Sequence, residues 1–198
     1  MNKTATPLLV AICFWAGTAQ TPQYNLGKRA APEEIHKRDI SVAPDGTGLP
    51  AGHGNVEEGR YIYKALCASC HGDRGQGSSE YPALVGGQGT LTSKEPVFTV
   101  GSYWPYATTL WDYTRRAMPY QRPGTLTPDE TYAVTAFILY MNGIVDEKAE
   151  LNAKTLPKVR MPNRDGFVPD PRPDVPHRRL SSWDKNGIKE PRNHSPRP

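Results

Sequence analysis

The residues Cys67-Ala68-Ser69-Cys70-His71 decide which fold this chain of 198 residues can adopt. Two cysteines three positions apart lie one above the other on a helical turn. Their sulfurs can therefore reach the two vinyl groups along one edge of a haem, and the imidazole of His71 follows where it can bind the iron. The pattern predicts one haem c that is attached covalently through Cys67 and Cys70 and ligated by His71.

Two other interpretations of the cysteine pair fit the sequence less well. A thioredoxin-like redox pair usually opens a helix after a strand, whereas this pair closes a helical segment. A structural zinc site needs four nitrogen or sulfur ligands, and the third cysteine of the chain, Cys13, does not supply a second pair. Three cysteines are also too few for a disulfide framework.

The segments around the motif carry helix signals. Asn55 is suited to cap a helix over residues 55–67, because two glutamates follow it in the first turn. Further helices are expected over 104–117 and 127–143, the last with a threonine cap, a proline at its first position and a glycine after its end. The Gly-rich stretch 72–102 is typical of a long loop, and no strand with sustained alternation occurs. The predicted fold class is all-α.

A haem held by one histidine needs a second axial ligand or keeps an open position. Met118 follows the second expected helix and precedes Pro119, which holds the chain extended toward the ring. Met141 lies inside the third helix and is expected in the core, while Met161 would require the C-terminal tail to fold back. We therefore expect His71 and Met118 as the metal ligands. Met/His ligation raises the reduction potential and closes the iron to small ligands, which indicates an electron carrier.

Aromatic side chains gather around the second expected helix, and we expect them to pack on the haem. They are Tyr103, Trp104, Tyr106, Trp111, Tyr113 and Tyr120. The chain offers no separate catalytic nucleophile, general base or molybdenum site, so it is not expected to be catalytic alone.

The two ends of the chain differ from its middle. Residues 1–19 combine a positive start, an apolar core and a small-residue cleavage site, which predicts a signal peptide and export to the periplasm. Residues 152–198 hold 11 Lys and Arg against 5 Asp and Glu, together with nine prolines, so this basic tail cannot build its own core. Between them we expect an extended segment over 20–54 and the haem domain over 55–151.

The composition argues against a transmembrane segment and against a nucleic-acid partner. No stretch of 18 apolar residues occurs, so no transmembrane segment is expected. A nucleic-acid function is disfavoured because the basic tail lacks an aromatic stacking platform and because the chain is expected to be exported.

Several positions resemble the class I cytochrome c family. Gly59 and Tyr63 stand eight and four residues before Cys67, where that family has a glycine and an aromatic that cross the last helix. Residues 136–139, Ala-Phe-Ile-Leu, look like the matching segment of that helix. The resemblance covers about residues 55–145 and implies a small class I cytochrome c fold around one covalent haem.

The stretch Tyr81-Pro82-Ala83-Leu84 resembles the proline loop of the same family. In that family the loop carbonyl accepts the proton on the far nitrogen of the ligand histidine. The resemblance therefore implies that Pro82 helps to bind the cofactor by fixing the tautomer and ring plane of His71.

Three flanking stretches, residues 41–52, 101–109 and 115–119, have a narrower resemblance. They are similar to the cytochrome subunits of sulfane dehydrogenases in the Sox sulfur-oxidation system and of related sulfite dehydrogenases. This resemblance implies a molybdenum-containing dehydrogenase subunit as electron donor and a downstream acceptor such as another cytochrome c. A generic diffusible shuttle and an open-site haem enzyme or gas sensor are the alternative functions.

Overall fold

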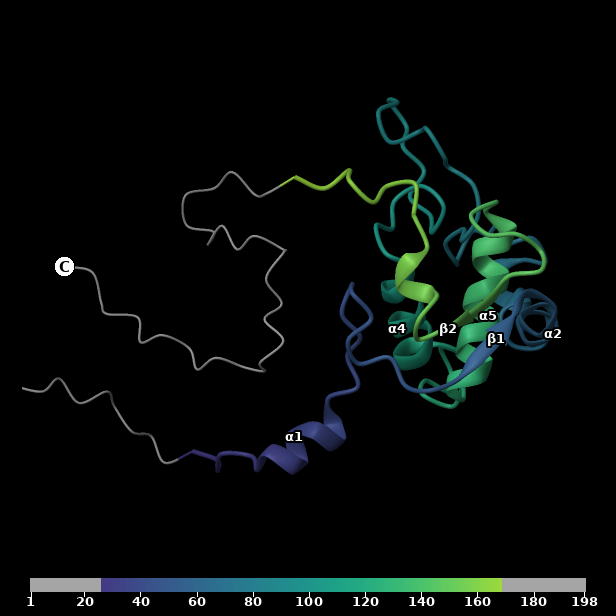
Figure 1. The fold of residues 1–198 in the computed structure, drawn as a ribbon. Helices are drawn as coiled ribbons and strands as arrows, with labels where there is room; N and C mark the ends of the chain where they lie inside the picture. The colour runs from purple at the N-terminus through teal and green to yellow at the C-terminus, as the bar shows by residue number, and fades with distance from the viewer. Residues whose placement is uncertain (1–25, 169–198) are drawn as a thin grey trace, which may run out of the picture. The chain divides into compact units, whose positions relative to one another are not determined.

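The computed structural model describes residues 26–168 and divides into two units, Met1–Asp39 and Ile40–Pro198 (Figure 1). Each unit is considered by itself. The predicted signal peptide, residues 1–19, lies outside the described residues.

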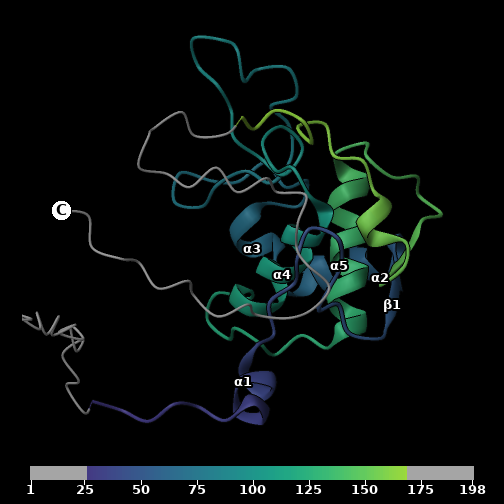
Figure 2. The same cartoon turned by 60° about the vertical axis from the view of Figure 1, so that its left-hand side comes forward.

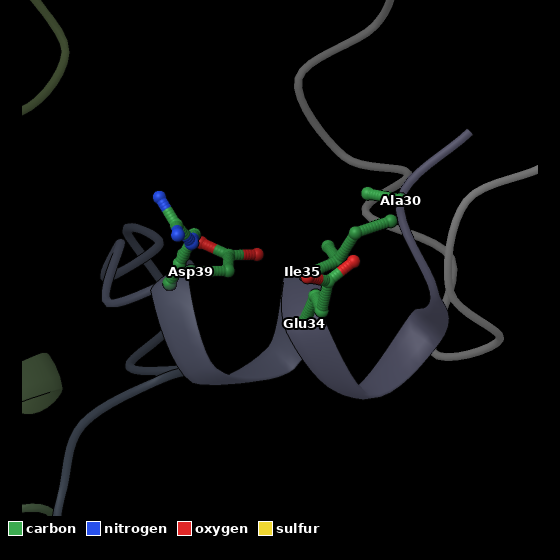
Figure 3. A pocket seen from close by; sticks show the side chains of 5 residues that line it. Ala30, Glu34, Ile35 and Asp39 are labelled. Carbon is green, nitrogen blue, oxygen red and sulfur yellow. The ribbon is translucent and has the colours of Figure 1, made fainter. Parts of the chain in front are cut away.

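The first unit contains one short helix, α1 (Pro32–Arg38). Its start is set by the proline at the first helical position and by Glu34, whose carboxylate accepts a hydrogen bond from the backbone nitrogen of Ala31 at 3.2 Å. A hollow beside this helix is shown in Figure 3 and is lined by Ala30, Glu34, Ile35, Arg38 and Asp39. None of the predicted site residues lies there.

The second unit is built from helices around one apolar core. In chain order its elements are β1 (His53–Asn55), α2 (Val56–Leu66), α3 (Ala68–His71), α4 (Ala107–Ala117), α5 (Pro128–Met141), β2 (Glu150–Asn152) and the 3₁₀ helix η1 (Leu156–Lys158). The all-α prediction is confirmed, with one addition: β1 and β2 pair antiparallel, with Gly54 opposite Leu151. Strands of three residues are too short to show an alternation in the sequence.

Side-chain caps fix the starts of α2 and α5 where the sequence predicts them. Asn55 Oδ1 accepts from the nitrogen of Glu58 at 2.9 Å, and the Glu58 carboxylate accepts from the nitrogen of Asn55 at 3.1 Å. Thr127 and Glu130 make the same reciprocal pair at the start of α5, at 3.2 and 2.8 Å.

The start of α4 differs from the prediction by three residues. The sequence predicts a helix from Trp104, whereas α4 begins at Ala107 after an extended Tyr106. Pro105 explains why Trp104 is not helical, because a proline disfavours helical backbone at the residue before it, and the extended Tyr106 moves the start to Ala107.

Helix α2 crosses α5 at very close range (Figure 2). A Cβ atom at Gly59 would overlap the backbone carbonyl of Ala133, so only glycine allows this approach. Tyr63 and Phe137 meet edge to face beside the crossing, with ring centroids 5.3 Å apart. The guanidinium of Arg60 covers the Phe137 ring at 5.1 Å.

Gly59→Ala is expected to destabilise the protein by about 3 kcal/mol, because the added methyl group must push two backbones apart. Urea unfolding of the haem-loaded chain measures this change. Lys64→Ala is the matched control, since Lys64 is exposed on the same helix and its loss is expected to cost about 0.5 kcal/mol or less. Equal stability of the two variants would contradict the proposed crossing.

The first part of the predicted tail belongs to the packed core. Leu156 is fully buried and Met161 is 2% exposed, and both join the cluster that contains Trp111 and Tyr132. Composition places the end of the haem domain at residue 151, whereas the apolar core extends along the chain to Met161. Residues 169–198 of the tail lie outside the described residues.

An extended stretch before β1 also lies against the helices. The Val42 nitrogen donates to Asp112 Oδ1 at 3.1 Å, and Thr108 Oγ1 donates to the Pro44 carbonyl at 3.3 Å. Asp112 also pairs with Arg116 on the next turn of α4. No helix within residues 26–168 is long and apolar enough to cross a membrane.

Candidate haem site

The two cysteines and the histidine of the motif lie on one turn. Cys67 ends α2, while Cys70 and His71 belong to α3. The nitrogens of Cys70 and His71 both donate to the Cys67 carbonyl, at 3.1 and 3.0 Å. The two thiols are free and half-buried, so the turn presents both sulfurs and the imidazole together.

His71 and Pro82 are brought together as the resemblance implies. His71 Nδ1 lies 3.0 Å from the Pro82 carbonyl oxygen. A carbonyl oxygen can only accept, so Nδ1 carries the proton and Nε2 keeps its lone pair for a metal. The loop is held in place because Gly77 donates to the His71 carbonyl at 2.8 Å and Leu84 donates to the Gly75 carbonyl at 2.8 Å.

Tyr63 stabilises the same turn through a hydrogen bond. Its hydroxyl donates to the Gly72 carbonyl at 2.9 Å, one residue after His71. Burial raises the pKa of the Tyr63 phenol, so the hydroxyl keeps its proton and remains a donor. Burial also raises the pKa of the Cys67 thiol to about 11, and the neighbouring Cys70 adds to this shift. Without the cofactor this thiol is therefore protonated at neutral pH.

The three methionines named by the sequence occupy different environments. Met118 directly follows α4, has extended backbone and is half-buried. Met141 is half-buried at the end of α5, and Met161 lies within the apolar core. A ligand role for Met161 requires the tail to fold back, and the segment that carries Met161 does fold back. The Met161 side chain, however, is packed among core residues.

Two buried donors on α4 lack partners. Trp111 Nε1 and Arg115 Nη1 have no hydrogen-bond acceptor within the described part of the chain, and the Arg115 guanidinium lies 5.5 Å from the centre of the Trp111 ring. Trp111 and Arg115 stand four residues apart on α4, so they share one face of that helix. A buried donor without a partner costs about 1–3 kcal/mol, and more when the donor is charged.

These donors fit a haem, because its propionate oxygens can accept from both and can balance the charge of the guanidinium. The two thiols, the oriented imidazole and the half-buried thioether supply the remaining ligand chemistry of haem c. Sequence reasoning treated Trp111 as a packing aromatic and did not single out Arg115. The sequence offers one sign of such a pair: Trp111 and Arg115 are spaced by one helical turn and precede Met118. This spacing becomes informative only once both donor atoms are known to be buried.

The cytochrome c family profile matches residues 56–142 of this chain. The crystal structure of the sulfane dehydrogenase SoxCD from Paracoccus pantotrophus contains a chain with 41% sequence identity and a TM-score of 0.70, over 88% of this chain and 87% of that one. The thiosulfate dehydrogenase of Stutzerimonas stutzeri (strain A1501) is 27% identical over 135 residues, which is 66% of this chain. This chain spans 37% of the length of that curated relative.

Proposed function

Since this chain belongs to the cytochrome c family, which binds haem c covalently, we propose that it is the electron-transfer subunit of a sulfur-compound dehydrogenase. The observation that carries the proposal is the 41% identity to a chain of a sulfane dehydrogenase over nearly the whole of both chains. The similarity to a thiosulfate dehydrogenase supports the same substrate class.

The site residues divide the work of holding the haem. Cys67 and Cys70 would form the two thioether bonds, and His71 Nε2 would ligate the iron while Pro82 holds its Nδ1 proton. Met118 would supply the second protein ligand of the iron. When bound, the haem supplies reversible one-electron chemistry at its iron.

The residues around the metal favour electron transfer over catalysis at the iron. The soft thioether of Met118, as a ligand to the iron, would favour the ferrous form and would close the iron to small ligands. Trp111 and Arg115 would donate to a propionate and balance its charge. The Pro82 carbonyl would keep the imidazole plane fixed in both oxidation states, so little reorganisation accompanies each electron.

The electrons would come from a molybdenum-containing subunit that oxidises a sulfane or sulfite-type substrate, and would leave to another cytochrome c. The expected signal peptide puts this exchange in the periplasm.

A stopped-flow experiment tests the proposal: the full-length, haem-loaded chain is mixed with the molybdenum dehydrogenase subunit of the same organism. Haem reduction is expected only after sulfite, thiosulfate or a sulfane compound is added. A chain that elutes alone and is not reduced with any of these would point to the diffusible shuttle, and rapid carbon monoxide binding would point to an open-site haem protein.

Cys67→Ser and Cys70→Ser are each expected to leave one thioether bond, and the double variant none. The haem of the wild-type chain is expected to survive an acid-acetone wash at one haem per chain, whereas that of the double variant is lost. The pyridine haemochrome spectrum measures both results. A wild-type stoichiometry near two, or haem lost in the wash, would contradict covalent attachment at a single site.

Arg115→Leu is expected to lower the reduction potential on the order of 60 mV, one tenfold step for a one-electron couple, because a cation that pairs with a propionate disfavours the ferric state. Without this cation the propionate should also titrate nearer neutral pH, so the potential should become more dependent on pH. Spectroelectrochemistry across pH 5–8 measures both effects. Arg115→Lys should restore most of the potential, and Arg122→Leu, at an exposed site, is the control. An Arg115→Leu potential equal to that of the control would remove Arg115 from the site.

A further inference from the structure

Three aromatic rings form an exposed cluster away from the haem-binding residues in the sequence. Phe98 and Tyr103 meet edge to face with centroids 5.1 Å apart, and Tyr103 meets Phe167 at 5.2 Å. The exposed fractions are 59% for Phe98, 40% for Tyr103 and 48% for Phe167. With the neighbouring Val97 and Val168, both exposed, these residues form what we call the aromatic patch.

The aromatic patch joins two segments that are far apart in the chain, residues 97–103 and 163–168. Figures 1 and 2 show the loop before α4 beside the segment that follows η1. Asn163 Nδ2 donates to the Tyr103 carbonyl at 2.7 Å and fastens one segment to the other. A surface that is already ordered loses little conformational freedom when it binds.

Hydrogen bonds inside the loop hold the rings in place. Ser102 Oγ donates to the Val97 carbonyl at 2.6 Å and accepts from the Thr99 nitrogen at 2.9 Å. Both Thr99 and Ser102 are buried. The loop therefore has a polar core of its own and presents its aromatic side chains outward.

The aromatic patch differs from single exposed aromatic residues elsewhere in the described chain, because its three rings contact one another. Tyr61 is 68% exposed on α2, but no ring contact with it occurs among the described residues. Isolated exposed apolar residues are ordinary, whereas contiguous ones mark interaction surfaces, and aromatic residues dominate the energetics of such surfaces.

The charges around the aromatic patch indicate what covers it. Arg160 pairs with Asp165 at 2.8 Å, which leaves Arg164 as the excess cation of the segment that carries Phe167. The chain continues from Val168 for 30 residues that hold seven Lys and Arg against four Asp and Glu. A second copy of the chain would carry the same excess of positive charge, whereas a partner rich in carboxylates would be attracted.

We propose that the aromatic patch docks this cytochrome onto its dehydrogenase subunit, whose matching surface is an apolar cleft bordered by carboxylates. The inference rests on the proposed function, because that function names the partner. The aromatic patch contains none of Cys67, His71 or Met118. Variants of the aromatic patch should therefore weaken the complex without changing the haem.

The experiment compares Phe98→Ala/Phe167→Ala with Tyr61→Ala in the full-length, haem-loaded chain. Binding to the purified molybdenum dehydrogenase subunit of the same organism is measured by biolayer interferometry at low and high salt. The double variant is expected to raise Kd about 30-fold or more, as loss of an aromatic hot spot does, and Tyr61→Ala to change it about twofold or less. The haem spectrum and reduction potential of both variants should equal those of the wild type, which also confirms that they are folded.

Hydrogen exchange provides a second measurement that needs no substitution. Backbone amides in residues 97–103 and 163–168 are expected to gain protection when the dehydrogenase subunit is added. Tight wild-type binding that the double variant keeps, with no added protection in these segments, would overturn the docking role and leave the proposed function intact. Absence of wild-type binding would overturn the proposed function itself, and a dimer of the isolated chain that the double variant abolishes would assign the aromatic patch to a second copy.

Discussion

Met118→Ala is expected to lower the reduction potential on the order of 0.2 V, a fraction of the range of about 0.8 V that axial ligands set. Water or a nitrogen ligand stabilises ferric iron more than a thioether does, so the ferric form gains when the sulfur is removed. The weak red absorption band of ferric Met-ligated haem should disappear, and the iron should bind carbon monoxide. Potentiometric titration and visible spectroscopy measure these changes.

Met141→Leu and Met161→Leu are the controls, because leucine keeps the volume of each side chain and removes only the sulfur. Both variants should keep the red band. Met161→Leu has particular weight, since Met161 is the methionine whose segment folds back onto the core. If the red band is kept in Met118→Ala and lost in one of the controls, the methionine replaced in that control is the ligand.

Deletion of residues 152–198 is expected to abolish stable folding, whereas deletion of 169–198 should leave the haem spectrum unchanged. The longer deletion removes the end of β2 together with Leu156 and Met161, and loss of each buried side chain costs about 2–5 kcal/mol. Every residue of the core cluster lies before position 162, so the shorter deletion spares the core. Thermal unfolding followed at the haem absorption measures the difference. Equal unfolding temperatures for the two deletions would show that the segment 152–168 adds nothing to the fold.

Local chemistry made the helix ends predictable. The caps at Asn55 and Thr127 depend on side chains within three residues, so the sequence reveals them directly. The start of α4 was misplaced, although its cause, Pro105, is just as local. The cysteine motif likewise contains its own geometry in five consecutive residues.

Features that depend on packing between distant segments were harder to predict. The average composition of the tail hides two buried residues, Leu156 and Met161, among prolines and charged residues. The partnerless donors of Trp111 and Arg115 become visible only when burial is known. The contact between His71 and Pro82 was expected through family resemblance and is present. The ligand role of Met118 stays a prediction.

The pairing of β1 with β2 bears on the order in which the domain assembles. It closes a loop of roughly one hundred residues, and the entropy of closing such a loop must be overcome before the pair gains anything. The contact between His71 and Pro82 spans only 11 residues. Short-range contacts form earlier in folding than long-range ones. The attachment turn can thus take shape while the C-terminal segment is still unfolded, and the haem can become attached to a nascent domain that β2 seals afterwards.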